Sequence, residues 1–296
     1  MLPLLTPVQP TPADVHIDLS TPLFLIGSCF SDEIGAKLGA AGFDVLCNPF
    51  GTLYNPASIA DALQHVANNT PVSEDDLVHH DGHWHSWLHH SRFSHSDKPT
   101  CLTRCNEAIR QAHLFLNKRP ILLVTFGTAW TFTLTCPPED GGQHYLNKVV
   151  ANCHKLPARH FSRQRLTPSD ITTLWLPTAD ILSSYCPHTI LTVSPIRHMA
   201  DGAHGNQLSK STLLLATDDI LRQNTSTSYF DSYEIMMDEL RDYRFYARDL
   251  CHPSDVAIDI IWERFQQTYM NETTQQQIKR NEKEHLHSLH RTVIRD

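Results

Sequence analysis

The chain has 296 residues, of which 41% are hydrophobic, enough for one large domain or two small ones. Its formal net charge of -8, with no basic strip interleaved with aromatic residues, excludes nucleic-acid binding. No apolar run approaches the roughly 18 residues of a membrane span, and the proline-rich start carries no Lys or Arg before the first apolar run. We therefore expect a protein that is neither membrane-bound nor exported. The eight cysteines are expected to be reduced thiols, which indicates the cytoplasm.

Residues 1–20 are expected to form an irregular, proline-rich arm. An apolar strand over 24–27 then ends in Gly27-Ser28, and a helix is predicted over 32–41. Ser28 thus lies at the carboxyl end of a strand, where open α/β sheets perform chemistry. Glycine permits a sharp turn there, and the amides of the following helix can face an anion. Ser28 is a candidate nucleophile, although a Gly-Ser turn is also common in ordinary loops.

A second strand is predicted over 42–47, followed by a loop over 48–56. Asn55 and Pro56 have the residue types of a helix cap and first helical position, for a helix over 57–67. Gly51 in this loop is either a turn glycine or the source of a backbone N–H for an oxyanion.

The composition changes sharply at residues 70–100, a segment rich in histidine and tryptophan. Its histidines and tryptophans are His79, His80, His83, His85, His89, His90, His95, Trp84 and Trp87. A metal site is one interpretation, since imidazole is a common ligand. The pattern lacks a helical His-x-x-x-His frame with a carboxylate or cysteine. We favour a lid that stacks on and hydrogen-bonds to a polar substrate.

The rest of the chain alternates helices and strands. A helix over 102–116 leads into the clearest buried strand, 120–127, and a hairpin is predicted between 131–135 and 144–150. The remaining predicted elements are helices from 168 to about 185, 207 to 221 and 255 to 265, and strands over 189–193 and within 229–240. This alternation predicts a three-layer α/β/α sandwich with a central parallel sheet of about five strands.

An Asp-x-x-His pair, Asp249 and His252, follows the fifth predicted strand. Such a pair can place a carboxylate on the imidazole Nδ1 and leave Nε2 to take a serine proton, as in a catalytic triad. A surface ion pair is the alternative, because the chain contains 20 histidines. His198 and His204 are alternative bases.

Six ordered motifs resemble the GSCFA domain proteins, a branch of the SGNH (GDSL-like) hydrolase superfamily. They are Gly27-Ser28-Cys29-Phe30-Ser31, Asn48-Pro49-Phe50-Gly51, Thr125-Phe126-Gly127-Thr128-Ala129-Trp130, Asn152-Cys153-His154-Lys155, Ser194-Pro195-Ile196-Arg197-His198 and Arg241-Asp242-Tyr243-Arg244-Phe245-Tyr246. The resemblance covers about residues 22–265. It implies an SGNH-hydrolase, flavodoxin-like domain over 21–265 with the insertion at about 70–100, preceded by the arm 1–20. Residues 266–296 would form a peripheral helix or tail.

The resemblance implies that Ser28 is the nucleophile, His252 the base and Asp249 its orienting acid. It assigns the amides of Ser28 and Gly51 to the oxyanion hole. The superfamily's third block reads Gly-x-Asn-Asp, and its asparagine is the third oxyanion donor, whereas here Gly127 is followed by Thr128, Ala129 and Trp130. The replacement donor is expected among Thr128, Asn152 and His154, with Asn152 favoured for its carboxamide.

The resulting hypothesis is a serine esterase that removes a short acyl group, such as acetyl, from a carbohydrate-like or other small polar molecule. Neither a cofactor nor a metal is expected. The residues expected to bind substrate are His154, Trp130, Arg197, His198 and Trp87. The alternatives are an O-acyltransferase with the same triad and a metal- or ligand-binding module with an inactive triad. The sequence leaves the oligomeric state open.

Overall fold

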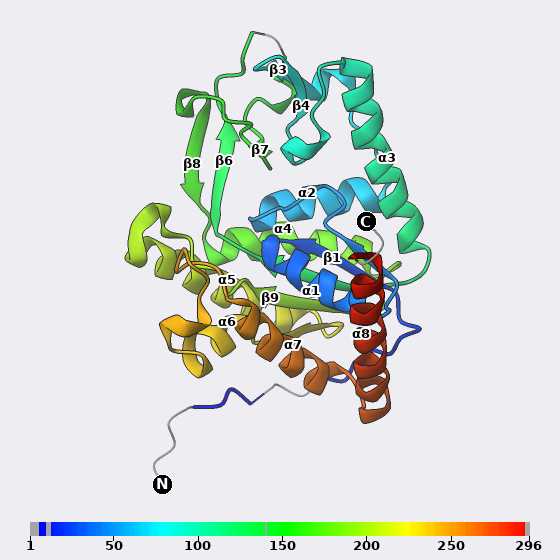
Figure 1. The fold of residues 1–296 in the computed structure, drawn as a ribbon. Coiled ribbons are helices and arrows are strands. Elements are labelled where there is room, and N and C mark those ends of the chain that lie inside the picture. The colour runs from blue at the N-terminus through cyan, green and yellow to red at the C-terminus, as the bar shows by residue number, and fades with distance from the viewer. Residues whose placement is uncertain (1–5, 10–12, 140, 294–296) are drawn as a thin grey trace.

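The computed structural model describes residues 6–9, 13–139 and 141–293. Five parallel strands form its central sheet, in the order β2-β1-β5-β9-β10 (Figure 1). These strands are β1 (Leu23–Gly27), β2 (Val45–Cys47), β5 (Ile121–Phe126), β9 (Thr189–Val193) and β10 (Thr227–Tyr229). Counted along the sheet, this is the 2-1-3-4-5 order of flavodoxin-like proteins.

Helices cover both faces of the sheet. One face packs against α2 (Pro56–Ala67), α3 (Lys98–Leu116), α4 (Pro168–Leu182) and α5 (Gly202–Gln223). The other packs against α1 (Cys29–Ala40), α7 (Asp255–Tyr269) and α8 (Glu272–Val293). Side chains alternate across each strand, so in β1 Phe24 and Ile26 face the first set while Leu23 and Leu25 face the second. The predicted three-layer α/β/α sandwich is confirmed.

Local sequence signals set where several helices begin. The side chain of Asn55 accepts a hydrogen bond from the N–H of Ser58, and Pro56 occupies the first position of α2. At α4, Thr167 and Asp170 form a reciprocal capping box. These caps satisfy amides that have no partner inside the helix.

Antiparallel strands form an additional layer outside the sandwich, above α2 in Figure 1, which we call the antiparallel layer. It contains the hairpin β3 (Leu77–His80) and β4 (His83–Ser86), and a three-stranded sheet of β6 (Trp130–Leu134), β7 (Val149–Val150) and β8 (Phe161–Arg165). The predicted pairing of 131–135 with 144–150 is confirmed by β6 and β7. Strand β8 was not predicted, because its largely exposed Phe-Ser-Arg-Gln-Arg sequence shows no apolar alternation.

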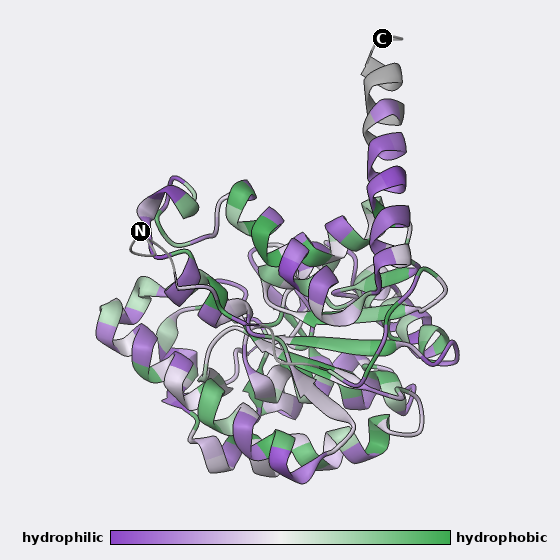
Figure 2. Ribbon diagram, turned by 90° about the horizontal axis from the view of Figure 1, so that it is seen from below, coloured by the Kyte–Doolittle hydropathy of each residue, from purple (hydrophilic) through white to green (hydrophobic). Residues whose placement is uncertain are grey.

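The prediction of a strand within 229–240 is wrong. Strand β10 ends at Tyr229, and the chain then forms the short helix α6 (Ser232–Glu234) and a π-helical turn over Ile235–Glu239. Beyond them, α8 follows α7 and extends away from the body of the protein (Figure 2). In the arm, Ile17 is buried and donates its N–H to the carbonyl of Tyr269 at 2.8 Å, while residues 1–5 and 10–12 lie outside the described residues.

Among the described residues, no helix is both long enough and apolar enough to cross a membrane.

Candidate active site

The turn after β1 requires a glycine. Gly27 has φ +145°, and a Cβ there would lie 2.3 Å from the carbonyl oxygen of Thr125 on β5. Ser28 follows at the start of α1 and is almost completely buried. Because β1 and β5 approach so closely, the serine emerges at the carboxyl edge of the sheet in one defined position.

The carboxamide of Asn48 holds this turn in place. Its Oδ1 accepts the N–H of Gly27 at 2.8 Å, and its Nδ2 donates to Asp32 on α1 at 2.7 Å. Asn48 is buried and adopts φ +43°, a region that asparagine tolerates better than most residues. The turn is therefore fixed from both the strand side and the helix side.

Asp249 and His252 form the predicted pair. His252 Nδ1 lies 2.5 Å from Asp249 Oδ2, and Asp249 Oδ1 accepts the backbone N–H of Cys251 and of His252 at 2.9 and 3.0 Å. These backbone donors, followed by the imidazole, lower the pKa of Asp249 to about 2. The N–H of Arg197 donates to the carbonyl of Cys251 at 3.0 Å, which ties this loop to the segment after β9.

His252 Nε2 lies 3.9 Å from the Sγ of Cys29, the residue after Ser28. Ser28 Oγ accepts the N–H of Phe30 at 3.3 Å, and its own hydrogen has no acceptor in the described part of the chain. The structure thus brings Ser28 and His252 to one site without a hydrogen bond between them. A hydrogen bond between them would require a side-chain rotation, of the kind by which the catalytic contacts of some enzymes tighten on substrate binding.

A cavity of about 390 Å³ contains Ser28 and His252. The sheet edge and the loops next to it contribute Ser28, Cys29, Tyr54, Asn55, Gly127, Thr128, Ser194, Ile196, Arg197, His198 and His252. The antiparallel layer contributes Trp130, Phe132, Val150, Ala151 and Arg163. The volume of this cavity suits a small molecule.

The two predicted backbone oxyanion donors are engaged elsewhere. The N–H of Gly51 donates to the carbonyl of Asn48 at 2.8 Å, and Gly51 does not line the cavity. Gly51 has φ +83°, and a Cβ at this position would lie 2.2 Å from the Cβ of His90. Both the backbone conformation of this turn and the close contact with His90 therefore favour glycine. The N–H of Ser28 points to the carbonyl of Thr125 at 3.3 Å.

The predicted side-chain donors differ in their position relative to the cavity. Thr128 lines the cavity, but its Oγ1 contacts Ser209 Oγ at 3.1 Å and accepts the N–H of Trp130 at 3.2 Å. Asn152 uses its Oδ1 to accept the N–H of His154 at 2.8 Å and does not line the cavity. The structure therefore places Asn152 in a turn, and the return of the hairpin brings Val150 and Ala151 to the site instead.

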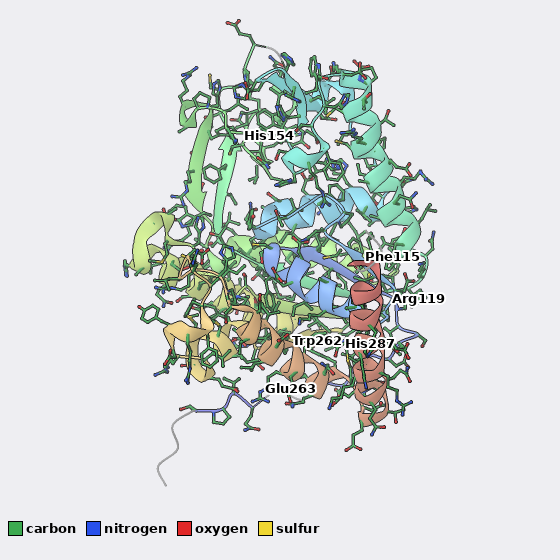
Figure 3. The ribbon with its side chains drawn as sticks, viewed as in Figure 1. Phe115, Arg119, His154, Trp262, Glu263 and His287 are labelled. Atoms are coloured by element: carbon green, nitrogen blue, oxygen red, sulfur yellow. The ribbon has the colours of Figure 1, made fainter. Side chains whose placement is uncertain are left out.

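Of the residues predicted to bind substrate, Trp130, Arg197 and His198 line the cavity. Trp87 and His154 do not. Trp87 is fully buried in the core of the antiparallel layer. His154 lies in the same layer (Figure 3), and its ring is tilted by 30° against that of His85, with the ring centres 4.5 Å apart. Burial lowers the pKa of His154 to about 4, so its role is that of a neutral core residue.

The His/Trp-rich segment does not form a lid whose rings face Ser28. Trp84 and His79 line a separate cavity of about 560 Å³, and His89 is fully buried against Phe50. The segment instead supports the turn, because Arg92 donates to the carbonyl of Asn48 at 2.6 Å. Among the described residues, no group of three or more His, Cys, Asp or Glu is placed to hold a metal ion.

Asn55, expected from the sequence only as a helix cap, also lines the cavity that contains Ser28. Its Oδ1 accepts the N–H of Ser58 at 2.8 Å, which orients the carboxamide. The Nδ2 group has no acceptor in the part of the chain that the structure describes, and the residue is 6% exposed. Asn55 therefore offers an oriented donor at the site, in the place where Asn152 was expected.

Lys210 on α5 was missed by the sequence analysis. Its Nζ donates to the carbonyls of Gly127 at 2.8 Å and Ser194 at 2.7 Å, the residues that follow β5 and β9. The side chain is 1% exposed, and burial lowers its pKa to about 7. Its neighbours Asn206, Ser209 and Leu213 are buried at helical spacing, which places Lys210 on the inner face of α5. Only Leu213 among them is apolar, so the sequence gives little sign of this face.

Together, the fold and site define a doubly wound α/β protein with a serine turn and an aspartate–histidine pair at the carboxyl edge of its parallel sheet. The sequence pattern of the GSCFA family matches residues 22–265, and the chain belongs to this family. Comparisons with curated proteins and with solved structures found no match.

Proposed function

We propose that this protein is a serine esterase of the SGNH type, which removes a short acyl group from a small polar or carbohydrate-like molecule. The observation that carries the proposal is the presence of Ser28 and His252 in one cavity, with Asp249 bound to the far nitrogen of the imidazole. Serine, histidine and aspartate in these roles are sufficient for acyl transfer on many unrelated folds.

In the proposed reaction, Ser28 Oγ attacks the ester carbonyl while His252 Nε2 accepts its proton. Asp249 holds Nδ1 protonated and stabilises the imidazolium. His252 then protonates the leaving alcohol, which gives an acyl-serine. Water attacks this intermediate with His252 again as base, and the carboxylic acid and free Ser28 are released.

Ser28 is a better candidate nucleophile than Cys29, although the side-chain contact of His252 Nε2 that the structure shows is with the thiol, at 3.9 Å. Burial, followed by the charge of Asp32, raises the pKa of the Cys29 thiol. A nucleophilic cysteine needs the opposite shift, because the thiolate is the reactive form. A serine needs only a base within reach, which His252 supplies after a rotation.

We assign the missing oxyanion donor to Asn55. Its carboxamide is the group that the superfamily uses, and its Nδ2 has no acceptor among the described residues. The backbone N–H of Cys29, in the first turn of α1, is a second candidate donor. One such donor is worth about 3 kcal/mol in comparable sites.

Labelling with a fluorophosphonate tests the nucleophile without knowledge of the substrate. We expect wild type and the matched control Cys29→Ala to be labelled, and Ser28→Ala to remain unlabelled while it keeps its circular dichroism spectrum. Labelling that survives Ser28→Ala would remove the assignment. Loss of labelling in Cys29→Ala alone would indicate a thiol nucleophile.

An O-acyltransferase would use the same acyl-serine with an alcohol acceptor in place of water. Product analysis separates the two reactions, since an esterase releases free acid even when acceptor alcohols are added.

We also propose a cytoplasmic location. The eight cysteines are all free thiols, of which Cys101, Cys105 and Cys186 are buried.

A further inference from the structure

The cavity that contains Ser28 has an unusual balance of charge for this protein. No aspartate or glutamate is among the described residues that line it, whereas Arg163, Arg197, His198 and His252 all do. The whole chain has a formal net charge of -8. A cavity lined only by basic ionisable side chains and thiol or phenol groups, in an acidic protein, favours anions locally.

The charge of Arg163 is already matched. Its two terminal nitrogens each contact a carboxylate oxygen of Asp201 at 2.6 Å. Its guanidinium also lies 4.0 Å from the centre of the Trp130 ring. Arg163 is therefore held in a bidentate pair and shapes the cavity wall.

Arg197 is different, because its guanidinium makes no ion pair with any carboxylate that the structure describes. The group lies 5.8 Å from the centre of the Tyr246 ring, and the residue is half-buried. Its backbone N–H donates to Cys251, which places Arg197 next to the loop that carries His252. A guanidinium has five N–H donors in a planar fork that suits a carboxylate or phosphate.

We propose that the substrate is an ester that also carries an anionic group, a carboxylate, sulfate or phosphate, which Arg197 binds. This inference rests on the proposed esterase function and specifies its substrate class. The anion takes no part in the bond changes: the ester C–O bond breaks, water supplies the new oxygen, and the anionic group serves only as an anchor. The anion can belong to the acyl part or to the alcohol part.

Three chromogenic esters test the proposal. They are neutral 4-nitrophenyl acetate, mono-4-nitrophenyl succinate with the carboxylate on the acyl part, and 3-carboxy-4-nitrophenyl acetate with the carboxylate on the leaving alcohol. We expect wild type to hydrolyse one anionic ester with kcat/KM at least about tenfold above that of the neutral ester. The preferred ester identifies the part that carries the anion.

The variant Arg197→Gln should lower the anionic-to-neutral ratio of kcat/KM by about tenfold, with Arg197→Lys intermediate. The matched control is Arg244→Gln. Arg244 is an exposed arginine that stacks on Phe245 and does not line this cavity. Equal kcat/KM for all three esters in wild type, or a ratio that Arg197→Gln leaves unchanged, would overturn the proposal.

A binding measurement separates failure of this inference from failure of the esterase function. Isothermal titration of Ser28→Ala with benzoate should show binding that the double variant Ser28→Ala/Arg197→Gln loses. Binding without turnover of any ester would support the anion site and count against the esterase. Turnover without benzoate binding or anionic preference would support the esterase and refute the anion site.

Discussion

Replacing Lys210 by methionine removes a buried amine and keeps much of its volume. Burial lowers the pKa of Lys210 from its ordinary value of 10.5 to about 7. A neutral amine has two N–H donors, and the carbonyls of Gly127 and Ser194 accept them, so the neutral form is fully satisfied in the folded protein. In the unfolded chain the side chain is in water and binds a proton up to a much higher pH.

The sign of the effect follows from this difference in pKa. Between pH about 7 and about 10.5 the unfolded state binds more protons than the folded state, so the free energy of unfolding rises with pH. This contribution of Lys210 to the free energy of unfolding is fully present above the pKa of the group in the unfolded chain. It is lost as the pH falls toward the pKa of the group in the folded protein. At about 1.4 kcal/mol per pKa unit, it amounts to about 3 kcal/mol between pH about 7 and about 9.5.

Urea unfolding of wild type and Lys210→Met, followed by circular dichroism in the presence of a reductant, measures this contribution. We expect the variant to be less stable than wild type above pH about 9, because two buried carbonyls lose their donors. The difference should widen by about 3 kcal/mol from pH about 7 to about 9.5. Titrations of groups common to both proteins largely cancel. A difference that stays constant within about 0.5 kcal/mol would refute a neutral amine at this position.

Two further predictions concern the site. Asn55→Asp keeps the oxygen that caps α2 but removes the amide donor, so it should lower kcat about 100-fold with little change in KM. The control Asn152→Asp should keep kcat within about threefold of wild type. Equal losses of kcat in the two variants would contradict the assignment to Asn55. His252→Ala should abolish ester turnover, whereas Asp249→Asn should leave measurable activity, because the acid of a triad contributes less than the base. The pKa of Asp249 is lowered to about 2, so its carboxylate is ionised at every pH above about 4, and the loss in Asp249→Asn should be present across the whole assay range. A pH at which Asp249→Asn equals wild type would argue against that role.

Strands β1, β5 and β9 could be predicted because each is a mainly apolar run between turn residues. The segment after β10 was misread for a related reason. Its buried residues Tyr233, Met236 and Leu240 recur at helical spacing, yet the surrounding apolar residues also fit a strand. A short apolar run fits both the helical and the strand period, and here packing against α7 favours the helical conformation.

The proposed oxyanion donor depends on features that sequence reasoning does not reach. Asn55 and Asn152 have the same chemistry, and each follows a strand in the predicted order. Which carboxamide faces Ser28 depends on the path of two loops, and the turn that His154 closes draws Asn152 away. Lys210 was missed for a different reason: of its buried neighbours on α5, Asn206 and Ser209 are polar and give no apolar pattern that would mark this face as the inner one.

The cavity is built from two parts of the chain that are structurally separate. The serine turn and the ends of β5 and β9 belong to the parallel sheet, whereas Trp130, Phe132 and Arg163 belong to the antiparallel layer. If the proposed function is correct, changes in β6 to β8 can alter the shape of the cavity without moving Ser28, because Ser28 is positioned by the turn at Gly27, where only a glycine fits against Thr125. Substitutions within residues 130–165 would therefore show how the shape of the cavity affects the proposed selectivity, separately from the anion contact proposed for Arg197.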